Sequence, residues 1–376
     1  MYKTDILIIG AGVIGLAIAE ELGKLSKSIV VVERNKSFGM ETSSRNSEVI
    51  HGGIYYPPGS LKAELCVRGR DLLYTFCARN GVPYKKTGKL IVATEADEIR
   101  LIEELFRNGV NNGVSGLKII DREDMKVIEP AVDGVRAIYS PETGIVDSHR
   151  LMQRLMSMAK SGGVTMVFGS EVTNIKKDND GYKVTLNDLE GLTGLSTVMV
   201  INCAGLDSDL IAEMAGIDIR ERKYELEYCK GQYFRVNQRK SGLIKGLIYP
   251  IPHPRAGVLG IHATPDLGGG LRLGPDHEFI KDRAKDYSVD PLRKREFYLS
   301  IRRFLPFIEE EDISVDTAGI RPKLKRHGSD FRDFVVNDEG ANGFPGLIDL
   351  IGIESPGLTA SLAIAEYVRR MVSLFI

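Results

Sequence analysis

The feature that most constrains the fold of this chain is a glycine-rich turn close to the N-terminus. An apolar run over residues 5–9 has the length of a buried parallel strand, and Gly10-Ala11-Gly12-Val13-Ile14-Gly15 follows it directly. A helix is expected over residues 14–25 and a second strand over 28–32. Strand, glycine turn, helix and strand in this order predict a βαβ unit and a mostly parallel sheet.

The spacing of the glycines matches the fingerprint of dinucleotide-binding sites. Gly10 makes the tight turn, Gly12 lets backbone N–H groups approach a pyrophosphate, and Gly15 allows close packing of helix on sheet. Glu33 lies 23 residues after Gly10, where a carboxylate can accept hydrogen bonds from a ribose diol. The carboxylate disfavours a 2′-phosphate, so NAD and FAD remain, beside the alternative of a purely structural glycine turn.

Flavin reductases that bind NAD beside FAD usually contain a second fingerprint. The sequence has no other Gly-x-Gly-x-x-Gly preceded by a strand, so NAD is not expected beside FAD. Electrons would then pass to oxygen, a quinone or a protein carrier.

Residues 42–56 form a polar stretch that can follow a bound flavin. Arg45 can neutralise a phosphate or lie on the surface, and Gly52 and Gly53 can lie against a flat ring or take positive φ. His51 precedes the glycine pair and could approach the same ring. Short polar donors suited to a pyrophosphate or ribityl chain are Ser43, Ser44, Asn46 and Ser47. The alternative is a surface loop with a hairpin turn at Gly-Gly.

Composition narrows the class of protein. A length of 376 residues, 43% hydrophobic and 27% charged, fits a globular protein of two domains or one large composite. The formal net charge of −1 provides no overall field that attracts nucleic acid or an anionic membrane. Four scattered cysteines without a Cys-x-x-Cys pair argue against zinc, an iron–sulfur cluster or a redox disulfide. Cys203 is expected to be a small core residue and not a nucleophile.

The sequence also bears on localisation. Because a strand is expected almost at residue 1, we expect no signal or transit peptide. No stretch reaches the ~20 apolar residues needed to span a bilayer. The apolar end at 371–376, after Arg369 and Arg370, can pack on the body or touch a membrane. We expect a cytoplasmic protein, with peripheral contact at the inner face of the membrane as the alternative.

The middle of the chain predicts a second, sheet-based domain. Residues 230–236 and 246–252 resemble strands, and 259–275 resembles a hairpin. A charged helix is expected over 283–304. Four residues could face a pocket: Tyr249, His253, His262 and Arg272. The alternative for each of them is a purely structural role.

Three further segments can contact ligands. Residues 200–205 form an apolar strand that ends in small residues, and 354–359 open the last helix with a Pro-Gly turn, so both can present N–H groups to a flavin. Arg321, between a glycine and a proline, is the preferred carboxylate anchor, because guanidinium pairs bidentately with carboxylate. The alternatives are an ordinary strand–turn–helix and a surface arginine.

The run Ser-Arg-Asn-Ser-Glu-Val-Ile-His-Gly-Gly-Ile-Tyr-Tyr at 44–56 closely resembles the L-2-hydroxyglutarate dehydrogenase/oxidase family, within the D-amino-acid-oxidase-like FAD-dependent oxidoreductases. The resemblance also covers the N-terminal fingerprint, 230–234, 319–323 and 348–365. It implies an α/β fold: a Rossmann-like FAD domain with a mostly parallel central sheet, and a discontinuous substrate domain with an antiparallel sheet. The FAD domain is expected at 1–84, 143–220 and 312–376, and the substrate domain at 85–142 and 221–311.

These arguments yield candidate site residues. His51, as the base, and Arg321, as the clamp on the substrate carboxylate, are the expected catalytic residues, although His253 or His262 could face the flavin instead of His51. The candidate substrate-binding residues are Lys230, Tyr249, His253, Arg272 and Lys323. The candidate cofactor-binding residues are Gly10, Gly12, Gly15, Glu33, Arg34, Ser43, Ser44, Arg45, Asn46, His51, Gly52, Val172, Ala204, Gly205, Gly319, Pro356, Gly357, Leu358 and Thr359.

The predicted activity is FAD-dependent oxidation of a small anionic L-2-hydroxy acid, in the first place L-2-hydroxyglutarate to 2-oxoglutarate. Lys230, Lys323 or Arg272 could meet the distal carboxylate of that substrate. Alternatives within the same fold are an amino-acid or amine oxidase and a glycerol-3-phosphate dehydrogenase. A non-enzymatic alternative is an assembly factor in which FAD is a structural element.

Overall fold

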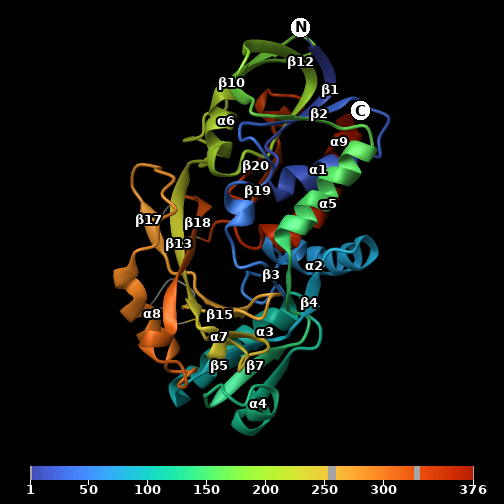
Figure 1. Cartoon of the computed structure of the whole chain (residues 1–376). Coiled ribbons are helices and arrows are strands. Elements are labelled where there is room, and N and C mark those ends of the chain that lie inside the picture. The colour runs from blue at the N-terminus through green and yellow to red at the C-terminus, as the bar shows by residue number, and fades with distance from the viewer. Residues whose placement is uncertain (1, 253–259, 326–330, 376) are drawn as a thin grey trace. The chain divides into compact units, whose positions relative to one another are not determined.

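The computed structural model describes residues 2–252, 260–325 and 331–375 (Figure 1). The chain divides into two compact units. The first unit comprises Met1–Ser44, Ser148–Tyr228 and Arg321–Ile376, and the second comprises Arg45–Asp147 and Cys229–Ile320. The predicted assignment of FAD and substrate to particular segments stays a prediction. The units differ from those segments mainly in residues 45–84, which belong to the second unit.

The first unit is built on an eight-stranded sheet with the order β10-β11-β12-β1-β2-β9, in which β20 joins β12 and β19 joins β20. Strands β20, β12, β1, β2 and β9 are parallel neighbours, and β10, β11 and β19 pair antiparallel. The strands are β1 (Tyr2–Ile9), β2 (Ile29–Glu33), β9 (Thr165–Phe168), β10 (Glu171–Asp178), β11 (Gly181–Asp188), β12 (Gly191–Asn202), β19 (Val335–Asp338) and β20 (Leu347–Ile351). The predicted α/β class with a mostly parallel central sheet is therefore confirmed.

Three helices of this unit pack together: α1 (Val13–Leu22) contacts both α5 (Ser148–Ser161) and α9 (Gly357–Phe375) (Figure 1). A shorter helix, α6 (Ser208–Ala215), follows β12. Ile6, Leu7 and Ile8 of β1 are fully buried, which is why this strand reads as a continuous apolar run and not as an alternating one.

The second unit contains a nine-stranded sheet with the order β17-β13-β16-β15-β14-β5-β7-β6, to which β18 is added beside β13. Strands β5 and β14 are parallel, whereas β7 pairs antiparallel with both β5 and β6, and β15 with both β14 and β16. The strands are β5 (Lys89–Ala93), β6 (Lys118–Asp121), β7 (Arg136–Ser140), β13 (Leu226–Val236), β14 (Leu247–Pro250), β15 (Ala263–Pro265), β16 (Leu271–Leu273), β17 (Glu278–Ile280) and β18 (Ile313–Leu324). The expected sheet in the middle of the chain is present.

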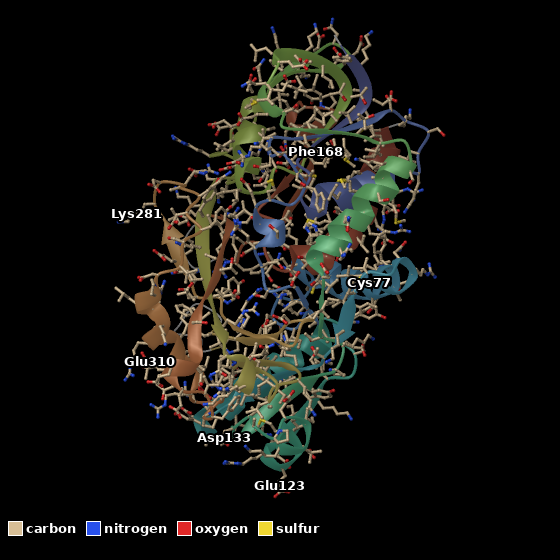
Figure 2. All side chains as sticks on the ribbon, viewed as in Figure 1. Cys77, Glu123, Asp133, Phe168, Lys281 and Glu310 are labelled. Carbon is tan, nitrogen blue, oxygen red and sulfur yellow. The ribbon has the colours of Figure 1, made fainter. Side chains whose placement is uncertain are left out.

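Helices and a small sheet complete the second unit. The three-stranded sheet consists of β3 (Val49–Ile50), β8 (Gly144–Val146) and β4 (Tyr84–Lys86). The helices are α2 (Leu61–Asn80), α3 (Ile99–Asn111), α4 (Arg122–Ile128), α7 (Gln238–Ser241) and α8 (Lys294–Ile301). Figure 2 shows Cys77 on α2. All four cysteines of the chain are buried free thiols, and burial raises the pKa of Cys77 to about 12.

The expected helix over 283–304 was too long, because α8 spans only Lys294–Ile301. Two contacts hold the preceding segment in an irregular conformation. Lys230 Nζ lies 2.6 Å from Asp286, and the backbone N–H of Asp290 donates to the Gln232 side chain at 2.7 Å. Tertiary partners therefore compete successfully with local helix propensity here.

The described part of the chain has no helix with the length and apolarity required to cross a membrane. In α9, Val368 and Val372 are buried, whereas Leu374 is exposed.

A buried carboxyl group lies at the centre of the first sheet. Asp349 on β20 is aligned with Asn202 on β12, whose side-chain amide donates to Asp349 Oδ1 at 2.7 Å. Asp349 Oδ2 is buried and has no hydrogen-bond partner among the described residues. Burial raises the pKa of Asp349 from 3.8 to about 7, so this carboxyl group is protonated in the folded protein at acidic pH.

Substitution of Asp349 by asparagine should change how stability depends on pH. A raised pKa in the folded state stabilises at low pH, and this stabilisation is lost as pH rises towards the folded pKa. The gap between 3.8 and about 7 corresponds to roughly 4 kcal/mol. Between pH 4 and pH 8 the free energy of unfolding of the wild type should therefore fall relative to Asp349→Asn, as measured by urea denaturation. Asp180→Asn, at an exposed position, is the control. Parallel pH profiles for wild type and Asp349→Asn would contradict the assignment.

Candidate functional sites in the two units

The glycine turn of the first unit lies where two parallel strands end side by side. Ile9 of β1 is aligned with Asn202 of β12, so the turn at Gly10 meets the chain that leaves β12. Gly10 has φ +103°, and a Cβ at this position would lie 2.5 Å from the carbonyl oxygen of Cys203. A Cβ on Gly15 would lie 2.0 Å from the carbonyl oxygen of Gly10. The carboxyl ends of adjacent parallel strands are where dinucleotides bind in this class of fold.

Glu33 and Ser43 support the same turn. Glu33 accepts hydrogen bonds from the N–H groups of Ala11 at 2.8 Å and Asn35 at 2.9 Å. Ser43 Oγ accepts from the N–H of Val13, the first residue of α1, at 3.0 Å, and Gly12 is the N-cap of α1. These two side chains fix the loop at the amino end of α1, where N–H groups can face a phosphate.

The other candidate cofactor residues of the first unit have different surroundings. Arg34 pairs with Glu41 at 2.7 Å and with Asp207, so its charge is already compensated. Ala204 and Gly205 follow β12 directly, and Gly205 has φ +57°. Ser44 is exposed, Val172 is buried on β10, and α9 begins with Gly357, Leu358 and Thr359 after the cis bond to Pro356. Their contact with a cofactor stays a prediction.

Arg321 and Lys323 lie near the end of β18, in the part of this strand after Ile320 that belongs to the first unit. Arg321 is half-buried. Lys323 Nζ lies 2.8 Å from Glu354, so this lysine has a carboxylate partner within its own unit. The role of Arg321 as a carboxylate clamp stays a prediction.

The predicted flavin stretch continues into the second unit with tight packing. The guanidinium of Arg45 lies 4.2 Å from the centre of the Tyr287 ring, and its buried Nε has no hydrogen-bond partner among the described residues. A Cβ on Gly319 would lie 2.0 Å from the carbonyl oxygen of Arg45, which explains the glycine before Ile320-Arg321-Pro322. The side chain of Asn46 accepts from the N–H of Glu48 at 2.8 Å.

His51 is half-buried in the second unit, after β3. Burial, and next the charge of Lys89, lower the pKa of His51 to about 3. This value lies well below the ordinary histidine pKa of ~6.5. The imidazole is neutral at physiological pH, the form that can accept a proton, although burial makes it a weaker base. The following Gly52 packs against Ser140 and Thr143, and Gly53 has φ +97°.

The two predicted cations of the second unit are both paired with carboxylates. Lys230 is almost fully buried, and its Nζ lies 2.6 Å from Asp286, a contact that lowers the pKa of Asp286 to about 2. Arg272 Nε lies 2.7 Å from Asp316, and its Nη1 donates to the carbonyl oxygen of Asn46 at 3.2 Å. A substrate carboxylate would have to compete with these internal partners.

Sequence reasoning passed over a third cation, Lys89. It is the first residue of β5, and only 2% of its surface is exposed. Its Nζ lies 4.6 Å from the centre of the Tyr55 ring and 4.7 Å from that of Tyr249. Tyr249 in turn stacks on His262 with ring centres 3.5 Å apart. The signal in the sequence was a lysine at the start of the otherwise apolar run Leu-Ile-Val-Ala. His253 lies outside the described residues.

A family model described as FAD dependent oxidoreductase, DAO, matches residues 5–371. The chain belongs to this family. The predicted cofactor, FAD, is thereby confirmed, and the crowded glycine turn, Glu33 and the amino end of α1 suit its dinucleotide part. The relatives described next also confirm the resemblance to L-2-hydroxyglutarate dehydrogenases.

Relatives in three organisms are named "L-2-hydroxyglutarate dehydrogenase, mitochondrial". The protein from Arabidopsis thaliana is 39% identical, with 97% of this chain and 83% of the relative covered. The protein from Nematostella vectensis is 35% identical, with 97% and 89% covered. The protein from Homo sapiens is 34% identical, with 96% and 87% covered.

Solved structures agree with the family. L-alpha-glycerophosphate oxidase from Mycoplasma pneumoniae, with FAD bound, has a TM-score of 0.88 at 27% identity and covers 99% of this chain and 95% of that one. L-proline dehydrogenase from P. horikoshii has a TM-score of 0.80 at 21% identity, with 99% and 94% covered, and shows the fold alone.

Replacing Gly15 by alanine should damage both stability and FAD retention, because the added methyl group would lie 2.0 Å from the Gly10 carbonyl oxygen. We expect a loss of about 1–3 kcal/mol or more in the free energy of unfolding and a lower ratio of FAD to protein. Denaturant titration and flavin absorbance measure these quantities. Gly242→Ala is the control, since φ is −69° there and no described atom lies within 4 Å of the added Cβ. A Gly15→Ala protein with wild-type stability and FAD content would contradict the packing argument.

Proposed function

We propose that this chain oxidises L-2-hydroxyglutarate to 2-oxoglutarate with FAD as cofactor. The observation that supports this substrate most directly is similarity over nearly the whole chain to proteins named L-2-hydroxyglutarate dehydrogenase, at 39% identity for the protein from Arabidopsis thaliana. The substrate class is a small anionic 2-hydroxy acid.

The proposed chemistry assigns one task to each catalytic residue. FAD, when bound, supplies the acceptor for the hydride that leaves the C2 carbon of the substrate. The neutral imidazole of His51 takes the proton of the C2 hydroxyl group, so that the C–O single bond becomes the carbonyl of the 2-oxo acid. Arg321 holds the carboxylate beside the reacting carbon through paired N–H donors.

The electron acceptor and the localisation are also part of the proposal. The acceptor is oxygen or a quinone-type carrier. The proposed location is the cytoplasm, and the alternative is peripheral contact with the inner face of the membrane. The relatives from Arabidopsis thaliana and Homo sapiens are named mitochondrial.

A second candidate is the oxidation of glycerol 3-phosphate. It is supported by the likeness to L-alpha-glycerophosphate oxidase, the neighbour with a TM-score of 0.88. Because a phosphate monoester and a dicarboxylate are both dianions at neutral pH, a buried cation could serve either substrate.

Anaerobic titration with L-2-hydroxyglutarate should bleach the visible absorbance of the flavin-loaded protein. D-2-hydroxyglutarate should leave the spectrum unchanged, since the mirror-image carbon cannot present both its hydrogen and its hydroxyl group to the same partners. Bleaching by glycerol 3-phosphate, with L-2-hydroxyglutarate inert, would reject the first candidate in favour of the second. Bleaching by amino acids alone would move the function to an amino-acid oxidase.

Removal of the base should slow the reaction without loss of cofactor. We expect His51→Gln to lower the rate of anaerobic flavin reduction by roughly 10²–10⁴-fold with FAD content unchanged. His149→Gln, at an exposed position, is the control. Because His51 loses a proton with a pKa of about 3, its base form persists on acidification, and the wild-type kcat/KM should show no acid limb near pH 6.5. An acid limb near pH 6.5 that His51→Gln removes would contradict the lowered pKa.

A further inference from the structure

Lys89 differs from every cation that the sequence suggested for the distal carboxylate. Lys230, Arg272 and Lys323 lie 2.6–2.8 Å from Asp286, Asp316 and Glu354, respectively. In the part of the chain that the structure describes, no Asp or Glu forms an ion pair with Lys89, although only 2% of its surface is exposed. Burial of an ammonium group without a carboxylate partner is unfavourable, and cation–π contacts offset only part of the desolvation free energy.

Among the described residues, the surroundings of Lys89 offer a hydrogen-bond donor and no carboxylate paired with its ammonium group. The Tyr55 and Tyr249 rings lie 4.6 and 4.7 Å from its Nζ. The hydroxyl group of Tyr55 is buried and has no hydrogen-bond partner within the described residues. The same tyrosine borders an open pocket of about 380 Å³ with Leu101, Leu105 and Ile251, so its side chain is not enclosed by core on all sides.

Three described titratable groups beside Lys89, on Cys66, Tyr55 and Tyr249, are neutral at physiological pH. Burial raises the pKa of the Cys66 thiol to about 12 and raises the pKa of both Tyr55 and Tyr249. Burial lowers the pKa of Lys89 itself to about 7, as expected for an ammonium group that has no carboxylate partner among the described residues. A carboxylate that arrived at this position would supply the missing partner.

We propose that Lys89 binds the second carboxylate of a dicarboxylic substrate, with the Tyr55 hydroxyl group as a further donor, and so selects dicarboxylates over monocarboxylates. The inference rests on the proposed oxidation of L-2-hydroxyglutarate and adds a residue that recognises the end of the substrate remote from the reacting carbon.

Pairing of Lys89 with a substrate carboxylate would also change the pKa of His51. The ammonium charge of Lys89 is one of the two causes that lower the pKa of His51, after burial. A carboxylate paired with Lys89 cancels that charge and makes the imidazole more basic. A substrate with the correct distal group thereby improves the base that acts on its hydroxyl group, whereas a monocarboxylate does not.

The experiment compares wild type, Lys89→Met and Lys86→Met as flavin-loaded proteins. Lys86 is the matched control, because its Nζ also lies 4.7 Å from a tyrosine ring, that of Tyr74, but is exposed and paired with Glu142 at 2.7 Å. Anaerobic reduction by L-2-hydroxyglutarate and by L-2-hydroxybutyrate gives kcat/KM for a dicarboxylate and a monocarboxylate. We expect Lys89→Met to lower the ratio of the two values by about 10- to 100-fold and Lys86→Met to leave it unchanged.

A binding measurement makes the proposal independent of turnover. Isothermal titration calorimetry with glutarate and butyrate should show tighter binding of glutarate to wild type and no such preference in Lys89→Met. This arm still tests Lys89 if L-2-hydroxyglutarate fails to reduce the flavin, an outcome that would reject the proposed substrate alone. An unchanged preference for glutarate in Lys89→Met, or an equal loss for both acids, would overturn the role of Lys89.

Thermal stability separates a ligand-binding lysine from a structural one. Methionine has a similar length and no charge to desolvate, so the Tm of Lys89→Met without ligand should equal or exceed that of wild type. A clearly lower Tm would identify Lys89 as a structural residue and overturn the proposal. Tyr55→Phe keeps the ammonium group and removes one donor, so it should lower the dicarboxylate preference only a few-fold. No change in Tyr55→Phe would remove Tyr55 from the site.

Discussion

The first unit depends on one close approach between backbone segments, at the point where β1 turns into α1. The carbonyl oxygens of Cys203 and Gly10 occupy the space that side chains at Gly10 and Gly15 would need. This absence of side chains lets the helix pack on the sheet, and it brings the ends of β1 and β12 together. Glu33 and Ser43 then hold the turn through hydrogen bonds to the N–H groups of Ala11 and Val13. A loop held in this way is prepared for a dinucleotide before the ligand arrives.

Charge compensation organises the second unit. Arg272 and Lys230 are each matched by a carboxylate close in space but distant in sequence, Asp316 and Asp286. Such pairs keep their partners in place but have little capacity left for a ligand. Lys89 lacks such a pair among the described residues and lies between two aromatic rings instead. A buried charge without an oppositely charged partner is found more often at binding sites than elsewhere in a fold.

Two of the buried titratable groups, Asp349 and Lys89, illustrate how position decides chemistry. Asp349 and Lys89 are both nearly inaccessible, and burial moves each towards its neutral form. Asp349 has a neutral partner, the amide of Asn202, and resides in the centre of a sheet, so its effect is on stability. Lys89 lies beside the rings of Tyr55 and Tyr249, and its charge lowers the pKa of His51, so its effect is on side chains of the proposed site.

The sequence by itself determined the βαβ unit, the glycine turn, FAD and the family, because these depend on local spacing: residues 10–15 and Glu33 are read along one stretch of chain. Only the tertiary structure decided which cations are compensated, since the partners of Lys230 and Arg272 are 56 and 44 residues away. The lowered pKa of His51 was likewise decided only by the tertiary structure. It arises from burial and from Lys89, 38 positions along the chain, and no local pattern around a histidine reports either cause.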